Sequence, residues 1–316
     1  MRKILITGGA GFIASSLAEE LIKDPENKIV IVDNLLTGSL EKIPVSKFDN
    51  CSFIKCSVNS LSDLQQIMVA NSFDYVFHYA ALVGVRRTLE NPVMVLEDIE
   101  GIKNILQLSK NTGVKRVYYA SSSEVYGESI SYPQNEVSTP LNSRLPYAVV
   151  KSVGESYCKS YQKEFGLEYT LFRFFNTYGP KQSIDFVMSR FLKLALQNAD
   201  ITVYGDGSQS RTFCYISDNI EASVTAFRNN MFINEVLNIG SEVETSILKL
   251  ANTIINITNS KSKIIHKPAR TEGDMKRRCP DTSRMKELLS HPRVSLEEGI
   301  HKLLESKYFI EKCQKS

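Results

Sequence analysis

The N-terminal stretch constrains the fold of this chain more than any other. An apolar run, Ile4–Ile6, ends abruptly in a turn where Gly8 and Gly11 let the backbone bend sharply and come close to a ligand. Apolar residues at helical spacing follow, starting with Phe12 and Ile13. This order predicts a strand, a tight turn and a helix whose free N–H groups face any anion bound at the turn.

A second apolar run, Lys28–Val32, ends in Asp33. An acid at the end of the second strand, about 20 residues after the glycines, is placed to hold a ribose 2′-hydroxyl. Its charge repels the 2′-phosphate of NADP, so we expect NAD. Ala14 stands where a third glycine is usual and adds a methyl group at the helix–strand contact. A glycine turn alone also fits an ordinary strand–helix turn, but the three features together predict a dinucleotide site.

Bulk properties exclude several classes of protein. The 316 residues suffice for one large domain, or for a large domain with a smaller one appended. A net charge of +3 gives no reason to expect nucleic acid or membrane binding. The first strand leaves no room for a signal peptide, so we expect a cytoplasmic protein. The six cysteines and four histidines show no metal-type spacing, so no metal site is predicted.

Strand and helix patterns alternate through the first half of the chain. This rhythm predicts an α/β fold with a Rossmann-type, doubly wound parallel sheet, and ligands outside the carboxyl ends of its strands. We expect residues 1–175, including a strand at 169–174, to form the NAD-binding domain. Residues 176–316 are expected to form mainly a smaller α/β substrate-binding domain, with some chain crossing back. Two long helices are expected at 90–112 and 147–166.

Tyr147 and Lys151 are spaced i, i+4, so both project from one face of the helix at 147–166. A phenol with a pKa near 10 is a poor base, and lowering it by roughly 3 units needs about 4 kcal/mol of preferential phenolate stabilisation. A neighbouring ammonium and a positive nicotinamide ring could supply that stabilisation. Tyr147 would then take a proton from an alcohol while NAD takes the hydride. An exposed helix face is the alternative for this pair.

Ser122 and Glu124 follow the strand expected at 116–120. At such a strand end Ser122 is placed to hydrogen-bond the reacting hydroxyl beside Tyr147, although a loop serine also commonly caps backbone. Glu124 fits two roles equally well, a second acid or base and an ion-pair partner.

Motifs spread over nearly the whole chain resemble the nucleotide-sugar epimerase/dehydratase family of extended short-chain dehydrogenases/reductases. The resemblance is very specific for the family and much less specific for the reaction. The matching segments are Thr7–Ile13, Asp33–Gly38, His78–Ala81, Ser121–Gly127, Tyr147–Lys151, Arg173–Pro180, Gly205–Phe213, Asn238–Gly240 and Arg270–Asp274.

The resemblance implies a role for each matching position. Ser122, Tyr147 and Lys151 fall on the catalytic Ser/Thr, Tyr and Lys, and Glu124 is a fourth catalytic candidate. The implied NAD-binding positions are Gly8, Gly11, Phe12, Ile13, Asp33, Asn34, Thr37, Gly38, Ser57, Val58, Ala80, Ala81, Tyr147 and Lys151. The implied positions for a nucleotide-diphosphate sugar are Ser122, Ser123, Asn176, Arg211, Arg270 and Asp274. Arginine suits phosphate because its guanidinium binds two oxygens at once.

Three positions depart from the family pattern. Ser57 replaces an acid that contacts adenine, and Asp98 replaces an asparagine in the helix before Gly101. Gly84 replaces a serine near the sugar. The family also pairs two long helices in a homodimer, so we expect a homodimer through 90–112 and 147–166, whereas the sequence alone predicts sheet-covering helices there.

Members of the family begin by oxidising the sugar, usually at C4, to a 4-keto intermediate. We expect a 4-epimerase, because the segment Leu82–Thr88 resembles epimerases. A net 4-dehydrogenase is an alternative, as is a UDP-glucuronate decarboxylase or 4,6-dehydratase, which fits the Ser123–Glu124 pair together with Arg211. An alternative of a different class is a non-catalytic NAD-binding protein, which the intact catalytic residues argue against.

Overall fold

The computed structural model describes residues 1–44, 48–269 and 275–315. The chain divides into two compact units. Unit 1 comprises Met1–Gly127, Leu141–Phe174 and Ile220–Leu237, and unit 2 comprises Glu128–Pro140, Phe175–Asn219 and Asn238–Ser316. The assignment of NAD binding to residues 1–175 and of substrate binding mainly to 176–316 stays a prediction.

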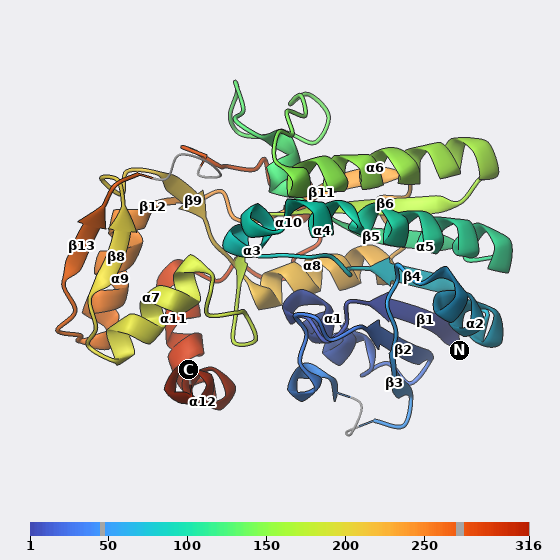
Figure 1. The fold of residues 1–316 in the computed structure, drawn as a ribbon, viewed down its shortest axis with the longest axis horizontal. Coiled ribbons are helices and arrows are strands. Elements are labelled where there is room, and N and C mark those ends of the chain that lie inside the picture. Colours follow the sequence, from blue (N-terminus) through green and yellow to red (C-terminus); the bar gives the residue numbers. More distant parts are fainter. Residues whose placement is uncertain (45–47, 270–274, 316) are drawn as a thin grey trace. The chain divides into compact units, whose positions relative to one another are not determined.

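A seven-stranded sheet in the order β11-β6-β5-β4-β1-β2-β3 forms the centre of the fold (Figure 1). Its neighbours from β3 to β6 pair in parallel throughout. The predicted doubly wound, Rossmann-type α/β fold is therefore confirmed. The strands are β1 (Arg2–Thr7), β2 (Asn27–Asp33), β3 (Cys51–Lys55), β4 (Tyr75–His78), β5 (Arg116–Ser122), β6 (Glu168–Phe174) and β11 (Glu235–Ile239).

The strand order reverses direction between β1 and β4. The chain runs from β1 outward through β2 to β3, then returns to β4 on the other side of β1 and continues to β5 and β6. Such a switch point opens a crevice at the carboxyl ends of the strands, where ligands of doubly wound proteins bind. Thr7 and His78 end the two strands in register at this point.

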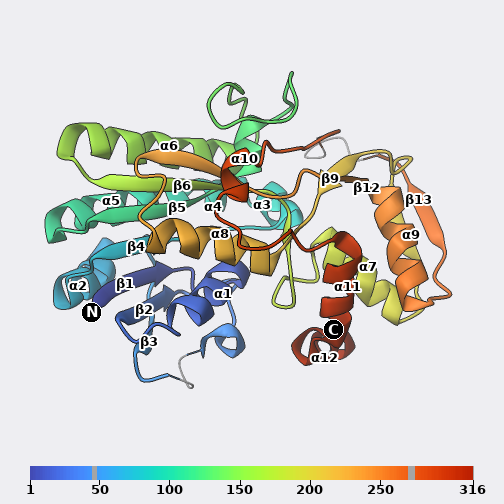
Figure 2. The same cartoon turned by 180° about the vertical axis from the view of Figure 1, so that it is seen from behind.

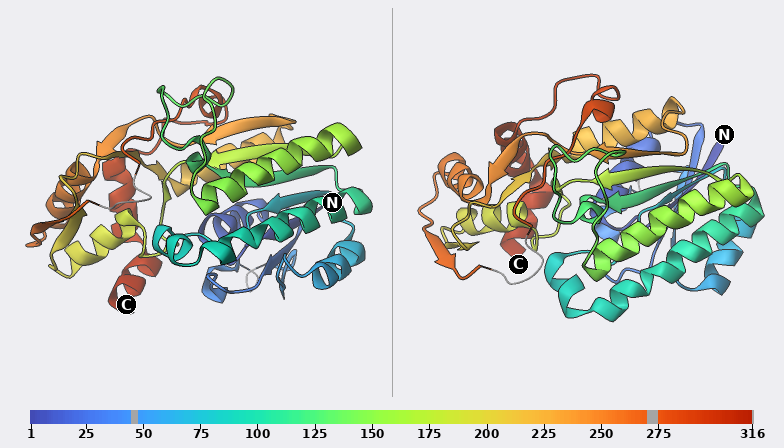
Figure 3. Two further views of the ribbon diagram at one scale, coloured as in Figure 1. Left: turned by 45° about the horizontal axis from the view of Figure 1, so that its top comes forward. Right: turned by 90° about the horizontal axis from the view of Figure 1, so that it is seen from above.

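Helices cover both faces of the sheet. Apolar side chains of α2 (Leu61–Asn71), α5 (Asp98–Thr112) and α6 (Pro146–Phe165) pack in one buried cluster with residues of β1, β2, β4, β5 and β6. Figure 3 shows α5 and α6 running side by side along this face. On the other face, Phe227 of α8 (Ile216–Arg228) packs edge-on against the stacked rings of Phe77 and Tyr118, whose centroids lie 4.5 Å apart. Helix α1 (Phe12–Leu21) follows β1 directly.

The helix expected at 90–112 is present as two helices, α4 (Pro92–Leu96) and α5, which are separated only by Glu97, a residue with a helical backbone. A short helix, α3 (Val85–Glu90), precedes them. Asn91 has a non-helical backbone, and Pro92 starts a new helix because proline lacks the N–H that a continuing helix needs. The expected helix at 147–166 is confirmed as α6.

The described residues of unit 2 form three two-stranded sheets and several helices (Figure 2). The strand pairs are β7 (Thr177–Tyr178) with β10 (Cys214–Tyr215), β9 (Ser210–Thr212) with β12 (Glu244–Ser246), and β8 (Ile201–Tyr204) with β13 (Ile264–Lys267). The helices are α7 (Val187–Leu196), α9 (Ile247–Thr258), α10 (Ser283–Lys286), α11 (Leu296–Glu305) and α12 (Lys307–Lys315). Unit 1 includes short 3-10 helices at Leu40–Lys42 and Ser123–Tyr126.

In the part of the chain that the structure describes, no helix is long and apolar enough to cross a membrane. Each of the six cysteines is a buried free thiol. Burial raises the pKa of Cys51 to about 11, so that thiol stays protonated and serves packing.

Candidate active site

The glycine turn lies between β1 and α1 at the switch point. Gly8 has φ +68°, and a Cβ atom there would lie 2.7 Å from the backbone nitrogen of Ala80, so a side chain would collide with the end of β4. The Gly11 N–H closes the turn on the Gly8 carbonyl at 2.9 Å. Within the described residues no side chain caps α1, so its first N–H groups are left to a ligand anion. This cradle fits the pyrophosphate of NAD.

Asp33 ends β2 and is only 8% exposed. Its Oδ2 accepts a hydrogen bond from the Ala10 N–H at 3.0 Å, and its Oδ1 accepts one from the Leu35 N–H at 2.7 Å. A Cβ atom on Gly38 would lie 2.9 Å from Oδ1, so glycine leaves the space beside the carboxylate open. Each carboxylate oxygen keeps lone-pair capacity for a ribose hydroxyl. The residues present therefore fit NAD, and the negative charge disfavours NADP.

Apart from Tyr147 and Lys151, the remaining predicted cofactor positions lie in the loops after β1 to β4 and in the first turn of α1. Asn34 and Thr37 are exposed, whereas Phe12, Ile13, Ala80 and Ala81 are half-buried. After β3, the Ser57 hydroxyl accepts a hydrogen bond from the Asn59 N–H at 3.3 Å. The Val58 carbonyl is held by the Asn104 side chain at 2.9 Å, which ties this loop to α5.

Lys151 is buried on the sheet-facing side of α6. Its side chain is 3% exposed, and its Nζ donates a hydrogen bond to the Ala120 carbonyl at 2.7 Å. The same nitrogen lies 5.7 Å from the ring centroid of Tyr147 and 5.1 Å from that of Tyr119. The pair is thus brought together by the helix, and an exposed helix face is excluded for Lys151.

Two groups interact electrostatically with Lys151, the half-buried Asp98 and the buried His78. Burial lowers the pKa of Lys151 to about 8, and the negative charge of Asp98 opposes that effect. Asp98 itself accepts a hydrogen bond from the Leu82 N–H at 2.7 Å, and burial raises its pKa. Burial, with a contribution from Lys151, lowers the pKa of His78 to about 3, so this imidazole is neutral. At neutral pH the positive charge beside Tyr147 therefore belongs to Lys151.

Ser122 is the last residue of β5 and is 9% exposed. Its hydroxyl oxygen accepts a hydrogen bond from the Glu124 N–H at 3.2 Å, which caps the 3-10 helix Ser123–Tyr126. The hydroxyl proton can still be donated, so capping and substrate binding are compatible. Ser123 is buried, whereas Glu124 is half-buried at the start of that 3-10 helix.

Sequence reasoning missed a buried network behind this strand end. The Ser121 hydroxyl donates to Glu155 at 2.6 Å, and Glu155 forms an ion pair with Arg173 at 2.7 Å. Arg173 also donates to the Tyr126 hydroxyl at 2.8 Å. Glu155 lies one helical turn after Lys151, so the i, i+4 spacing along α6 was the signal available in the sequence. The network fixes β5 and β6 against the helix that carries Tyr147.

Two further predicted substrate-binding residues, Asn176 and Arg211, belong to unit 2. Asn176 follows β6, and its buried amide nitrogen has no hydrogen-bond partner among the described residues. Arg211 lies on β9, is 9% exposed and donates from Nη1 to the Ser210 carbonyl at 2.7 Å. The predictions for Arg270 and Asp274 fall outside the described residues.

The fold and the glycine turn, with an acid at the end of β2 and a buried lysine one turn from a tyrosine, define an NAD-dependent enzyme of the extended short-chain dehydrogenase/reductase type. Residues 4–240 match the model of the NAD dependent epimerase/dehydratase family. The chain belongs to this family.

Three known proteins illustrate the similarity. A UDP-N-acetyl-α-D-glucosaminuronate decarboxylase of Bacillus cytotoxicus is 38% identical, over 96% of this chain and 97% of that protein. The crystal structure of the UDP-glucose 4-epimerase of Thermotoga maritima with UDP-glucose matches with a TM-score of 0.91 and 31% identity, over 98% of this chain and 99% of that one. A UDP-glucuronic acid 4-epimerase variant of Bacillus cereus, solved with NAD, matches with a TM-score of 0.89 and 29% identity over the same shares.

Proposed function

We propose that this enzyme oxidises C4 of a UDP-linked hexuronic acid, with or without a 2-acetamido group, and releases the C6 carboxylate as carbon dioxide. The observation that carries this proposal is the 38% identity to a decarboxylase of such a substrate over nearly the full length of both chains. The sequence alone favours a 4-epimerase and keeps decarboxylation as an alternative. The similarity to this decarboxylase leads us to rank decarboxylation ahead of 4-epimerisation.

In the first step Tyr147 takes the proton of the C4 hydroxyl. The Lys151 ammonium stabilises the phenolate, and the Ser122 hydroxyl holds the sugar oxygen. NAD, when bound, would supply the hydride acceptor at C4 and the source of the hydride that is returned to the same carbon. Asp33 and the glycine turn hold the cofactor, so a reaction that returns the hydride leaves the enzyme ready for another turnover.

Oxidation at C4 activates the carboxylate, because the new ketone lies β to C6. The C5–C6 bond breaks, carbon dioxide leaves, and the bonding electrons move to the C4 oxygen as an enolate. Ser122 and the protonated Tyr147 donate hydrogen bonds to that oxygen. A proton then adds at C5, and reduction at C4 with return of the Tyr147 proton gives a UDP-pentose. No base is required for the loss of carbon dioxide, so Glu124 serves at most as the acid at C5.

Asn176 and Arg211 are the residues we assign to the sugar nucleotide in unit 2. The unpartnered amide nitrogen of Asn176 is a buried donor that a ligand oxygen can satisfy. The Arg211 guanidinium suits the diphosphate. Arg270 and Asp274 are assigned to the same ligand on the family resemblance.

The test is to incubate the purified enzyme with UDP-glucuronate and UDP-N-acetylglucosaminuronate and to follow the products by NMR. The proposal expects a UDP-pentose, one carbon dioxide per turnover and no lasting NADH absorbance. A hexuronate product inverted at C4 contradicts decarboxylation. A persistent NADH signal of one per enzyme identifies net oxidation.

A 4-epimerase is the second candidate. It is favoured by the TM-score of 0.91 to a UDP-glucose 4-epimerase. The two candidates share C4 oxidation and differ only in the fate of the 4-keto sugar. UDP-glucose and UDP-N-acetylglucosamine in the same assay distinguish them, because these sugars have no carboxylate to lose: inversion at C4 identifies an epimerase, and a 4-keto-6-deoxy product identifies dehydration.

We also propose that the enzyme is a homodimer through α4, α5 and α6. Helix α4 exposes Val93 (72%), Leu96 (43%) and Met94 (40%). A groove of about 570 Å³ beside Tyr157 and Tyr161 runs along the outer face of α6. Light scattering with size-exclusion chromatography should give twice the chain mass, and Tyr157→Glu should halve it. A wild-type monomer at micromolar concentration contradicts the proposal.

A further inference from the structure

Glu244 joins two segments of unit 2 that flank the proposed diphosphate site. It starts β12, which pairs antiparallel with β9 so that Thr245 lies opposite Arg211. The Ser210 hydroxyl, on the residue before Arg211, donates a hydrogen bond to Glu244 Oε2 at 2.8 Å. The carboxylate therefore contacts the strand that carries Arg211 directly.

The second segment follows residues 270–274. Arg277 Nε donates to the two carboxylate oxygens of Glu244 at 3.0 and 2.9 Å, and its Nη2 also donates to Oε1. The guanidinium lies 4.4 Å from the ring centroid of Tyr132, whose hydroxyl donates to the Arg277 carbonyl at 3.1 Å. A backbone hydrogen bond from Ser210 N–H to the Lys276 carbonyl, 3.0 Å, runs alongside. Glu244 thus ties this segment to β9 at a fixed place.

The simpler interpretation is an ordinary surface ion pair, and the exposure of the two side chains decides how much such a pair stabilises the fold. The Arg277 side chain is 49% exposed and the Glu244 side chain 26%, so the pair contributes little to the free energy of unfolding. Its geometry is nevertheless specific, because the carboxylate accepts from a guanidinium fork and a serine together. The hydrogen bonds from Arg277 hold the pKa of Glu244 below its usual value, so the carboxylate is charged at neutral pH.

We infer that Glu244 is a positioning residue, which holds β9 and the segment after residue 274 so that Arg211 is preorganised for a nucleoside diphosphate. This inference rests on the proposed function. Without the Glu244–Arg277 pair, the segment after residue 274 has to be ordered when the ligand binds. The free energy needed for this ordering lowers the affinity for the ligand. Neither Glu244 nor Arg277 belongs to the Tyr147 site, so chemistry after binding is unaffected.

The experiment titrates UDP into the wild-type holoenzyme and Glu244→Gln by calorimetry and compares steady-state kinetics. We expect the Kd for UDP and the KM for the sugar nucleotide to rise about tenfold, while kcat stays within about twofold. Glu244→Asp keeps the charge and should restore part of the affinity. Adding Arg277→Gln to Glu244→Gln should change the Kd little further, because both act through one contact.

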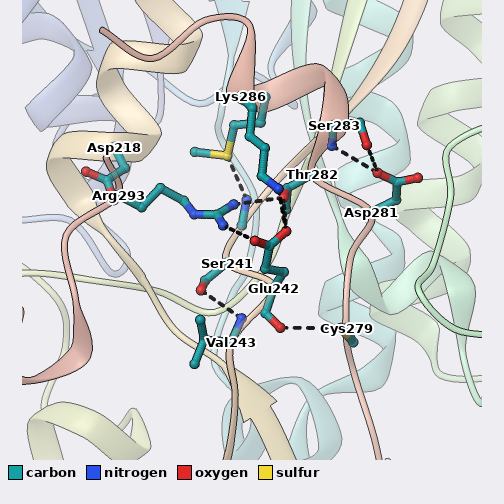
Figure 4. A network of polar contacts seen from close by, with 12 residues as sticks. Asp218, Ser241, Glu242, Val243, Cys279, Asp281, Thr282, Ser283, Lys286 and Arg293 are labelled. Atoms are coloured by element: carbon teal, nitrogen blue, oxygen red, sulfur yellow. Dashed lines mark hydrogen bonds and ion pairs between the residues drawn. The ribbon is translucent and has the colours of Figure 1, made fainter. Parts of the chain in front are cut away.

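Glu242 provides a matched control two residues earlier. It accepts from Lys286 at 2.9 Å, Arg293 at 2.8 Å and Thr282 at 3.0 Å, contacts that Figure 4 shows around α10. None of these partners lies on β9, so Glu242→Gln should leave UDP binding unchanged.

Two results would contradict the role of Glu244 and leave the proposed function standing. The first is that Glu244→Gln binds UDP as tightly as the wild type. The second is that Glu242→Gln and Glu244→Gln weaken UDP binding equally. A wild-type holoenzyme that binds no UDP overturns the proposed function and this inference together. Melting curves of all variants identify any loss of folded protein.

Discussion

The Lys151 ammonium donates a 2.7 Å hydrogen bond to the carbonyl oxygen of Ala120, two residues before Ser122. This contact joins α6, which carries Tyr147, to the end of β5. It uses one of the three ammonium protons and leaves the others for additional acceptors such as a cofactor ribose. The position of the proposed base and its charged neighbour is thus set by the sheet itself.

Tyr147→Phe removes the proposed base without changing the ring. We expect kcat to fall on the order of 10³-fold, the usual range for a lost acid–base group, while NAD stays bound. Turnover and cofactor content after gel filtration check this. Tyr157→Phe is the matched control on the same helix and should retain kcat; unchanged turnover in Tyr147→Phe assigns the base elsewhere.

The activity should decline at high pH as Lys151 loses its proton. Because burial lowers the pKa of Lys151 to about 8, we expect kcat/KM to fall above about pH 8. The negative charge of Asp98 favours the charged ammonium of Lys151. Asp98→Asn therefore lowers the pKa of Lys151 and moves the alkaline fall of kcat/KM to lower pH. His78, with a pKa of about 3, stays neutral throughout the range.

The pH profiles of kcat/KM for wild type, Asp98→Asn and Glu97→Gln measure this effect. Glu97 is the neighbouring, exposed acid, so Glu97→Gln should leave the pH at which kcat/KM falls nearly unchanged. If this pH rises in Asp98→Asn or does not change, deprotonation of Lys151 does not cause the alkaline fall of kcat/KM.

Asp33→Asn tests cofactor selection. Loss of the carboxylate removes the charge-assisted acceptor for the ribose and the repulsion of a 2′-phosphate, so we expect NADH to bind about tenfold more weakly and the preference over NADPH to shrink. Fluorescence titrations with both nucleotides measure the ratio. Asp63→Asn, an exposed acid on α2, is the control. An unchanged ratio in Asp33→Asn would remove Asp33 from the ribose site.

Glu155→Gln breaks a buried ion pair whose side chains are 2% and 1% exposed. Removing one partner leaves the Arg173 charge uncompensated, so we expect the free energy of unfolding to fall by about 3–5 kcal/mol. Urea denaturation measures this change. Glu100→Gln, in the exposed pair with Lys103, should unfold like wild type. A Glu155→Gln variant of wild-type stability means that the introduced amide and the Tyr126 hydroxyl suffice as partners of Arg173.

Local signals in the sequence predicted the secondary structure of the first half of the chain well. The turn at Gly8, the acid at Asp33 and the pattern of buried strands depend on neighbours in the chain, and the structure has them as expected. The start of the helix expected at 90–112 is shifted to Pro92, because proline is favoured at the first helical position.

Contacts distant in sequence were beyond prediction. The Glu155–Arg173 pair depends on α6 packing beneath β5 and β6, and the Glu244–Arg277 pair joins residues 33 positions apart. The lowered pKa of Lys151 follows from burial that its spacing from Tyr147 does not reveal. These features arise from tertiary packing rather than from motif spacing.

The central claim, removal and return of a hydride at C4, is tested most directly with a UDP-hexuronate deuterated at C4. The account predicts that the UDP-pentose product retains the deuterium at C4 after many turnovers, because the hydride returns to the carbon from which it came. Loss of the deuterium to solvent, or its release in free NADH, would contradict this mechanism.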